Sequence, residues 1–104
     1  MQNQELTSQA QHLGHLLARL RLARQVKQGE AAANAGLSRS TAARIEKGDA
    51  SVAIGHLLAY LRAIAPGTSL QDLLNGADPA LAALDDTEKR HRVRSGSPAG
   101  QPQL

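Results

Sequence analysis

The sequence predicts a small all-α protein, and its composition, its length and the spacing of its leucines each indicate this fold class. Its 104 residues include 19 Ala and 16 Leu, but only three Val, three Ile and no Phe or Trp. These side chains suit helices, whereas strands draw on β-branched and aromatic residues. A chain of this length has room for one hydrophobic core, so we expect a single domain with tails.

The composition also excludes several classes of protein. The sequence has no cysteine, which excludes disulfide scaffolds, thiolate zinc sites and cysteine nucleophiles. It has neither a run of about 18 apolar residues nor a signal-peptide pattern, and we expect a cytoplasmic protein with no membrane association. His12 and His15 have no third ligand near them, so we predict no metal and no cofactor. Common catalytic motifs are missing, and we expect no enzymatic activity.

The first helix is predicted over residues 9–25. Residues 1–8 are polar, and we expect them to be flexible. Ser8 and Gln11 have the spacing of a capping box at a helix start. An apolar stripe with helical spacing follows, formed by Leu13, Leu16, Leu17 and Leu20.

The next two helices are short, and a tight turn separates them. An alanine-rich segment, residues 28–35, ends at Gly36, a residue that suits the left-handed end of a helix. Ser38 is a good N-cap for a third helix that runs to Lys47. Gly48 follows as the end of that helix.

Two further helices complete the expected domain, residues 9–76. The fourth helix ends at the proline and glycine of residues 66–67, and its apolar face consists of Ile54, Leu57, Leu58, Leu61 and Ile64. The fifth begins with the capping pair Ser69 and Asp72 and ends at Gly76. Its apolar residues are Leu70, Leu73 and Leu74.

Residues 77–94 form an extension that is first acidic and then basic. Beyond Pro79 we expect one helical turn, through Leu81 and Leu84. The basic run that follows consists of Lys89, Arg90, Arg92 and Arg94. Residues 95–104 are dominated by Gly, Pro, Ser and Gln, and we predict a flexible, disordered tail.

Charge is distributed unevenly along the chain. The formal net charge is +3, but residues 15–47 carry seven basic and two acidic side chains, a local balance of +5. Residues 69–88 carry five acidic side chains and no basic one. A basic segment of this kind favours a surface that faces a polyanion.

The residues around the turn between the second and third helices have sizes that suit a close crossing of two helices. Ala32 leaves room for the third helix, and Gly36 permits a backbone turn that a Cβ would resist. Leu37, Ala42 and Ile45 fill the angle between the two helices from inside. This is the geometry of a helix-turn-helix, in which the second helix is presented to the major groove of DNA.

Residues 13–74 resemble the Cro/phage-repressor (XRE) family of helix-turn-helix domains. The resemblance covers more than half of the chain and includes residues of every predicted helix, namely Leu13, Gly14, Leu20, Arg21, Arg24, Gln28, Ala32, Gly36, Leu37, Ser38, Arg39, Ser40, Thr41, Ile45, Glu46, Lys47, Gly48, Leu57, Leu58, Ser69, Leu70, Leu73 and Leu74. It implies a five-helix DNA-binding domain. Four features depart from the family pattern. Lys27 replaces the usual Ser or Thr cap, and Gly29 weakens the same helical turn. Ala31 replaces a large aliphatic residue, and Gly55 with His56 is a poor start for the fourth helix.

The third helix carries the candidate residues for reading DNA. At 100° per residue, Ser40, Arg44 and Lys47 share one face, whereas Ala42 and Ile45 share the opposite, core face. The resemblance implies that Arg39, Ser40 and Arg44 lie beside base edges, with Thr41 as a further contact to bases or phosphates. Arg44 suits a bidentate bond to guanine.

The resemblance gives the remaining candidates supporting roles. Gln28 matches a glutamine that contacts the DNA backbone or braces the third helix in relatives. Arg24, Lys27 and Lys47 would bind phosphates, which position a protein on DNA without specifying sequence.

These residues together predict a sequence-specific transcriptional regulator. We expect a repressor that binds double-stranded DNA at a palindromic operator as a homodimer, because one such module buries too little surface for high specificity. The expected dimer surface is the fifth helix with Leu81 and Leu84, which have no obvious partner in the chain. The alternative is an antitoxin, because an acidic and then basic tail resembles that of small regulators paired with HipA-type toxin kinases.

Overall fold

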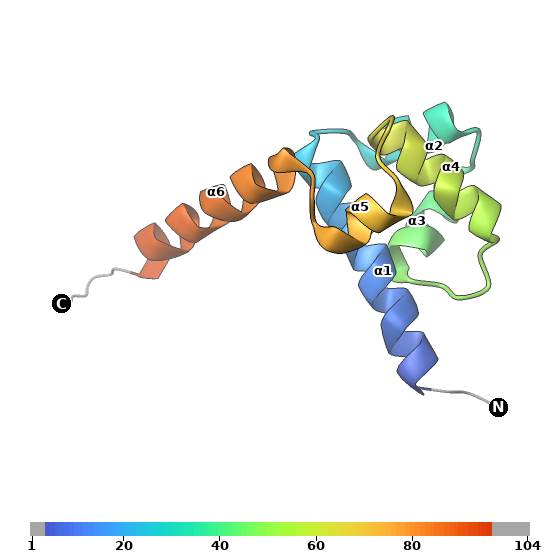
Figure 1. The fold of residues 1–104 in the computed structure, drawn as a ribbon, viewed down its shortest axis with the longest axis horizontal. Coiled ribbons are helices and arrows are strands. Elements are labelled where there is room, and N and C mark those ends of the chain that lie inside the picture. Colours follow the sequence, from blue (N-terminus) through green and yellow to red (C-terminus); the bar gives the residue numbers. More distant parts are fainter. Residues whose placement is uncertain (1–3, 97–104) are drawn as a thin grey trace.

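The computed structural model describes residues 4–96, with side chains as far as residue 90. Within these residues the chain forms six α-helices and no strand (Figure 1). The helices are α1 (Gln4–Ala23), α2 (Gln28–Ala35), α3 (Arg39–Lys47), α4 (Ile54–Ile64), α5 (Leu70–Asn75) and α6 (Pro79–Gly96). The all-α class and the five expected helices are confirmed, and α6 is a further helix.

The start of α1 differs from the expectation. The helix begins at Gln4, so Ser8 lies inside it and the predicted capping box with Gln11 is wrong. Residues 4–8, which were expected to be flexible, are helical, and residues 1–3 lie outside the described residues. Glu5 in the first turn favours this earlier start, because a negative charge there interacts well with the positive end of the helix dipole.

The ends of the short helices follow local sequence signals. Gly36 and Gly48 have φ angles of 72° and 80°, and each ends its helix in the left-handed conformation. Ser69 and Asp72 form a complete capping box at the start of α5. Lys27 precedes α2 without a capping side-chain bond, as its residue type predicts.

The core lies where α1, α2, α3 and α4 meet and is closed by α5. Its buried side chains are Leu17, Leu20, Ala31, Ala32, Ala42, Ile45, Tyr60, Leu61, Ile64, Ala65 and Leu73. The predicted apolar face of α4 is only partly correct, because Ile54 is 63% exposed and Leu58 is also exposed. Tyr60 is fully buried instead, so the face of α4 that packs against the core includes the tyrosine and is rotated relative to the predicted face.

Helices α1 and α3 cross with almost no space between their backbones. A Cβ atom added to Gly14 would lie 2.5 Å from the carbonyl oxygen of Ile45 and 2.7 Å from the backbone nitrogen of Gly48. A Cβ on Gly48 would clash with the Cα atom of Gln11. The two glycines therefore set the distance between α1 and the end of α3.

Helix α6 is longer than the single turn expected after Pro79. It extends away from the other helices (Figure 1), and its acidic first half is tied to α1. Arg19 forms ion pairs with Asp85 and Glu88, the latter at 2.7 Å. The sequence did not predict the full length of α6, because its ion pairs join it to residues that are distant along the chain.

Two other expectations about the C-terminal region need correction. Leu81 packs against the core and so has partners within the chain, and Leu84 is half-buried and lines a shallow pocket together with Leu22. Ser95 and Gly96 belong to α6, and the rest of the predicted disordered tail, residues 97–104, lies outside the described residues. No helix among residues 4–96 is long and apolar enough to cross a membrane.

Candidate nucleic-acid interface

Helix α3 presents a polar face to solvent and buries the opposite face. Arg39, Ser40 and Lys47 are exposed, and Arg44 has 47% of its side chain exposed. Ala42 and Ile45 are buried against the core. The helix therefore has an open surface of three basic side chains and one hydroxyl, as the spacing of these residues predicts.

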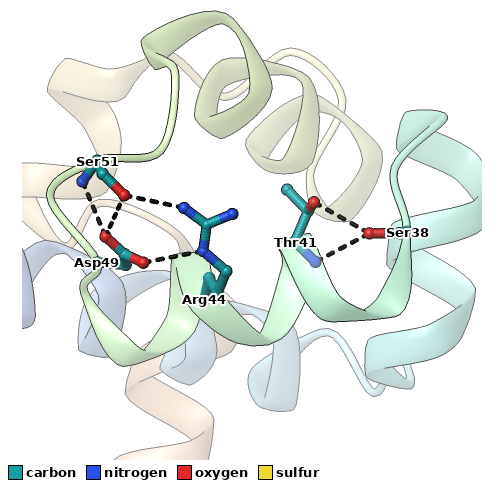
Figure 2. Close-up of polar contacts among 5 residues, drawn as sticks. All are labelled: Ser38, Thr41, Arg44, Asp49 and Ser51. Atoms are coloured by element: carbon teal, nitrogen blue, oxygen red, sulfur yellow. Dashed lines mark hydrogen bonds and ion pairs between the residues drawn. The ribbon is translucent and has the colours of Figure 1, made fainter.

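The start of α3 is fixed by its N-cap. The Ser38 hydroxyl accepts a bond from the backbone amide of Thr41 and donates to the Thr41 hydroxyl, each at 3.0 Å (Figure 2). This is the cap predicted from sequence. Because the Thr41 side chain is half-buried and bonded to Ser38, Ser40 is the more accessible of the two neighbouring hydroxyls.

Arg44 is held against the loop that follows α3. Its Nε donates to Asp49 at 2.8 Å, and its Nη2 donates to the Ser51 hydroxyl at 2.9 Å (Figure 2). Neither Asp49 nor Ser51 was identified from the sequence. The available signal was the Asp-Ala-Ser order directly after the helix, which favours an Asx turn.

A second group of side chains fixes the inner side of α3. Glu46 binds the Arg21 guanidinium of α1 through both carboxylate oxygens, at 2.6 and 3.1 Å. It also accepts hydrogen bonds from the Tyr60 hydroxyl of α4 and from the side-chain amide of Gln28 in α2. One carboxylate therefore connects α3 with all three helices that surround it.

The electrostatics of this group favour a charged Glu46. Burial raises the pKa of the Glu46 carboxyl, but the hydrogen bonds from Arg21, Tyr60 and Gln28 outweigh it, and the net pKa is lowered. The pKa of Tyr60 is raised by burial and by the neighbouring carboxylate, so the hydroxyl stays protonated and donates. Tyr60 could have been found from the sequence, because a lone tyrosine in an apolar helix needs a partner for its hydroxyl.

Gln28 and Arg39 are the first residues of α2 and α3, respectively. The Gln28 amide donates to Glu46 of α3 at 3.1 Å. The Arg39 guanidinium lies over the first turn of α2, where a Cβ on Gly29 would be 3.1 Å from its Nε. Gly29 thus weakens α2 locally but makes room for this cation.

Arg24 and Lys27 lie at the two ends of the connection between α1 and α2. Lys27 is exposed at the start of α2, beside the free amides of its first turn. The Arg24 guanidinium is bound to Asp78 at 2.7 Å, immediately before α6. Lys27 and the basic residues of α3 therefore keep all or part of their positive charge free for a ligand. The charge of Arg24, in contrast, is neutralised by Asp78.

Among residues 4–90, whose side chains the structure describes, no group of three or more histidine or acidic side chains is arranged to hold a metal ion. The open face of α3 instead offers guanidinium, ammonium and hydroxyl donors, which suit phosphate oxygens and base edges.

Comparison with known protein families gives a match to the helix-turn-helix domain over residues 12–74, more than half of the chain. The chain belongs to the helix-turn-helix domain family. This helix-turn-helix domain includes α2 and α3 as the two motif helices, and such a domain indicates DNA binding, typical of non-enzymatic transcriptional regulators. Comparisons with curated proteins and with solved structures give no match.

Proposed function

We propose that this helix-turn-helix protein is a sequence-specific repressor of the Cro/phage-repressor type, which binds a palindromic operator as a homodimer. The observation that carries the proposal is the outward face of α3, where Arg39, Ser40, Arg44 and Lys47 are exposed while Ala42 and Ile45 are buried. Repression follows when the bound protein occupies promoter DNA.

The proposed contacts divide into base readout and phosphate binding. Arg39, Ser40 and Arg44 face base edges. Thr41, which is bonded to the N-cap Ser38, is a further contact at the start of the helix. Lys27 and Lys47 bind phosphates, and the amides at the start of α2 favour the same ligand. Arg24 contributes least to phosphate binding, because Asp78 already neutralises its charge.

The homodimer supplies the specificity that one domain lacks. Two half-sites separated by about 34 Å, one turn of DNA, match a two-fold symmetric pair of domains. Leu74 of α5 is exposed and remains available for contact between subunits. Footprinting on DNA upstream of the coding sequence tests this symmetry, since two protected half-sites support a dimer and one protected site contradicts it.

Replacing Arg44 with alanine is expected to reduce sequence selectivity, because it removes the side chain proposed to read a guanine. The preference for a selected duplex over a scrambled duplex should fall by about 5- to 150-fold, the equivalent of roughly 1–3 kcal/mol for one bidentate contact. Gel-shift titrations with duplexes selected by the parent protein from a randomised pool measure this ratio. The matched control is Arg62→Ala, an exposed arginine on α4, which should keep the parent ratio. If Arg44→Ala also keeps it, the readout assignment is wrong.

Deleting residues 89–104 is expected to reduce the salt dependence of DNA binding if the basic end of α6 contacts phosphates. The run contains four cations, Lys89, Arg90, Arg92 and Arg94, and each phosphate contact contributes about 0.9 to the slope of log affinity against log salt. Deletion of residues 97–104 removes no charged side chain and is the matched control. Equal slopes for the two deletions would contradict a role for the basic run in binding DNA.

The antitoxin alternative has less support than the repressor. It depends on the acidic and then basic tail, and most of the acidic part has a structural role, since Asp85 and Glu88 pair with Arg19 of α1 and Asp78 pairs with Arg24 just after α1. Recovery of a kinase in a pull-down with the full chain would favour the antitoxin over the single-function regulator.

A further inference from the structure

Arg44 of α3 and two residues of the following loop, Asp49 and Ser51, form a closed ring of hydrogen bonds. This ring is separate from the core and from the Glu46 group. Asp49 accepts two bonds at one carboxylate oxygen, from the Ser51 backbone amide at 2.9 Å and from the Ser51 hydroxyl at 2.6 Å. Its other oxygen accepts from Arg44 at 2.8 Å, and Ser51 accepts from the same guanidinium at 2.9 Å. All three residues are exposed, so the ring lies on the surface rather than supporting the interior.

The ring occupies one particular edge of the Arg44 guanidinium. Asp49 and Ser51 bind Nε and Nη2, which form the side edge of the group. A guanidinium has five N–H donors, and its end edge, formed by Nη1 and Nη2, is a second bidentate surface. Among the side chains described, residues 4–90, none hydrogen-bonds to Nη1, and Figure 2 shows this nitrogen pointing away from Asp49 and Ser51, on the side of Thr41.

We propose that Asp49 and Ser51 are positioning residues, which hold Arg44 with its end edge free to bind a guanine and so determine how strongly the protein prefers guanine at that position. The inference rests on the proposed function, because it assumes that α3 enters the major groove. Guanine presents two acceptors, O6 and N7, which match the two donors of the free edge.

Orientation before binding has a measurable consequence. A free arginine side chain samples many rotamers, and fixing one such side chain on binding lowers affinity by roughly 2- to 12-fold. In this protein Asp49 and Ser51 fix Arg44 before DNA arrives. The guanine contact therefore keeps a larger share of its favourable energy than it would for an unrestrained arginine.

The negative charge of Asp49 adds to this preference. The pKa of Asp49 lies well below its usual range because the Ser51 hydroxyl, Arg44 and the Ser51 amide donate to it, so the carboxylate is ionised at neutral pH. An ionised Asp49 cancels much of the attraction of Arg44 for phosphates of any sequence. The ring thus weakens non-specific binding while it supports specific binding.

The test is a double-mutant cycle on the full chain. The affinities of the parent, Asp49→Ala, Arg44→Ala and the double variant are measured at one salt concentration. The probes are a duplex selected by the parent from a randomised pool and a scrambled duplex of the same composition. Asp49→Ala should lower the ratio of specific to scrambled affinity about tenfold and raise affinity for the scrambled duplex. In the Arg44→Ala background, the same change should leave the ratio unaltered.

Additional variants separate orientation from folding and from net charge. Asp49→Asn keeps an acceptor for Ser51 and should lower the ratio less than alanine does. Asp86→Ala removes an exposed acidic residue of α6 and should leave the ratio at the parent value. Thermal unfolding of each variant confirms that the domains compared are folded.

The outcomes distinguish this inference from the proposed function. The positioning role is overturned, and the readout by Arg44 stands, if Arg44→Ala lowers the ratio of specific to scrambled affinity while both Asp49 variants keep the parent ratio. The same conclusion follows if Asp49→Ala lowers the ratio by the same factor in the parent and in Arg44→Ala. If Asp49→Ala tightens binding to both duplexes by the same factor, Asp49 only competes with DNA, and the inference is again overturned. An unchanged ratio in Arg44→Ala overturns the readout and the inference together.

Discussion

Replacing Glu46 with glutamine is expected to lower the free energy of unfolding by about 3 kcal/mol. This is the low end of the range for breaking a buried ion pair, because the pair of Glu46 and Arg21 is only partly buried. The Glu46 side chain is 9% exposed and that of Arg21 is 14% exposed, so the substitution leaves a nearly buried guanidinium without its counter-charge. The hydroxyl of Tyr60 and the amide of Gln28 lose a charged acceptor as well. Urea unfolding of the parent and the variant, followed by circular dichroism, measures the difference.

Because Glu46 joins α3 to α1, α2 and α4, the same variant should also lose DNA affinity at temperatures where it is still folded. The matched control is Glu30→Gln, which makes the same chemical change at an exposed position of α2 and should lower stability by less than about 1 kcal/mol. Equal losses for Glu46→Gln and Glu30→Gln would show that the Glu46 group does not hold α3 in place.

Acid provides a second check on the role of Glu46. Its pKa is lowered in the folded protein, so its contribution to stability is fully present above the unfolded value of about 4.3 and disappears as the pH falls through the folded pKa. The stability difference between the parent and Glu46→Gln should therefore be constant near neutral pH and shrink in acid. A difference that grows as the pH falls would contradict the lowered pKa.

The sequence predicted the parts of this fold that depend on near neighbours along the chain. The ends of α2, α3 and α5 follow from single residues, because Gly36, Gly48 and Ser69 act on backbone groups within one turn. The outward face of α3 follows equally from its helical period. These signals need no knowledge of where other helices lie.

The sequence did not predict features that depend on distant partners. Helix α6 contacts α1 through ion pairs, and nothing near Asp85 in sequence indicates that Arg19 lies beside it. Glu46 and Arg21 were identified only as residues that match the family, and their contact with each other and with Tyr60 depends on how α1, α3 and α4 pack together. In the same way, Arg44 was correctly expected at the surface, but its attachment to Asp49 required the path of the loop after α3.

Gly14 is the second position where we expect a large effect, because backbone atoms surround it. Gly14→Ala should lower the free energy of unfolding by about 3 kcal/mol, the upper part of the usual range for overpacking. The new Cβ would lie 2.5 Å from the Ile45 oxygen and 2.8 Å from the Glu46 oxygen. Both are backbone atoms of α3, so α1 and α3 must move apart to relieve the contact. Denaturant unfolding measures the loss.

The same substitution at Gly55 is the matched control and has the opposite expected sign. Gly55 lies in the first turn of α4 with no atom within 4 Å of a new Cβ, so Gly55→Ala should stabilise the protein by about 0.5 kcal/mol through helix propensity. The separation of α1 and α3 in Gly14→Ala also moves the end of α3. This variant should therefore bind DNA more weakly than expected from the fraction of protein that remains folded. A Gly14→Ala protein as stable as Gly55→Ala would mean that α1 and α3 do not cross at the distance described, and the presentation of Arg44 and Lys47 would have to be reconsidered.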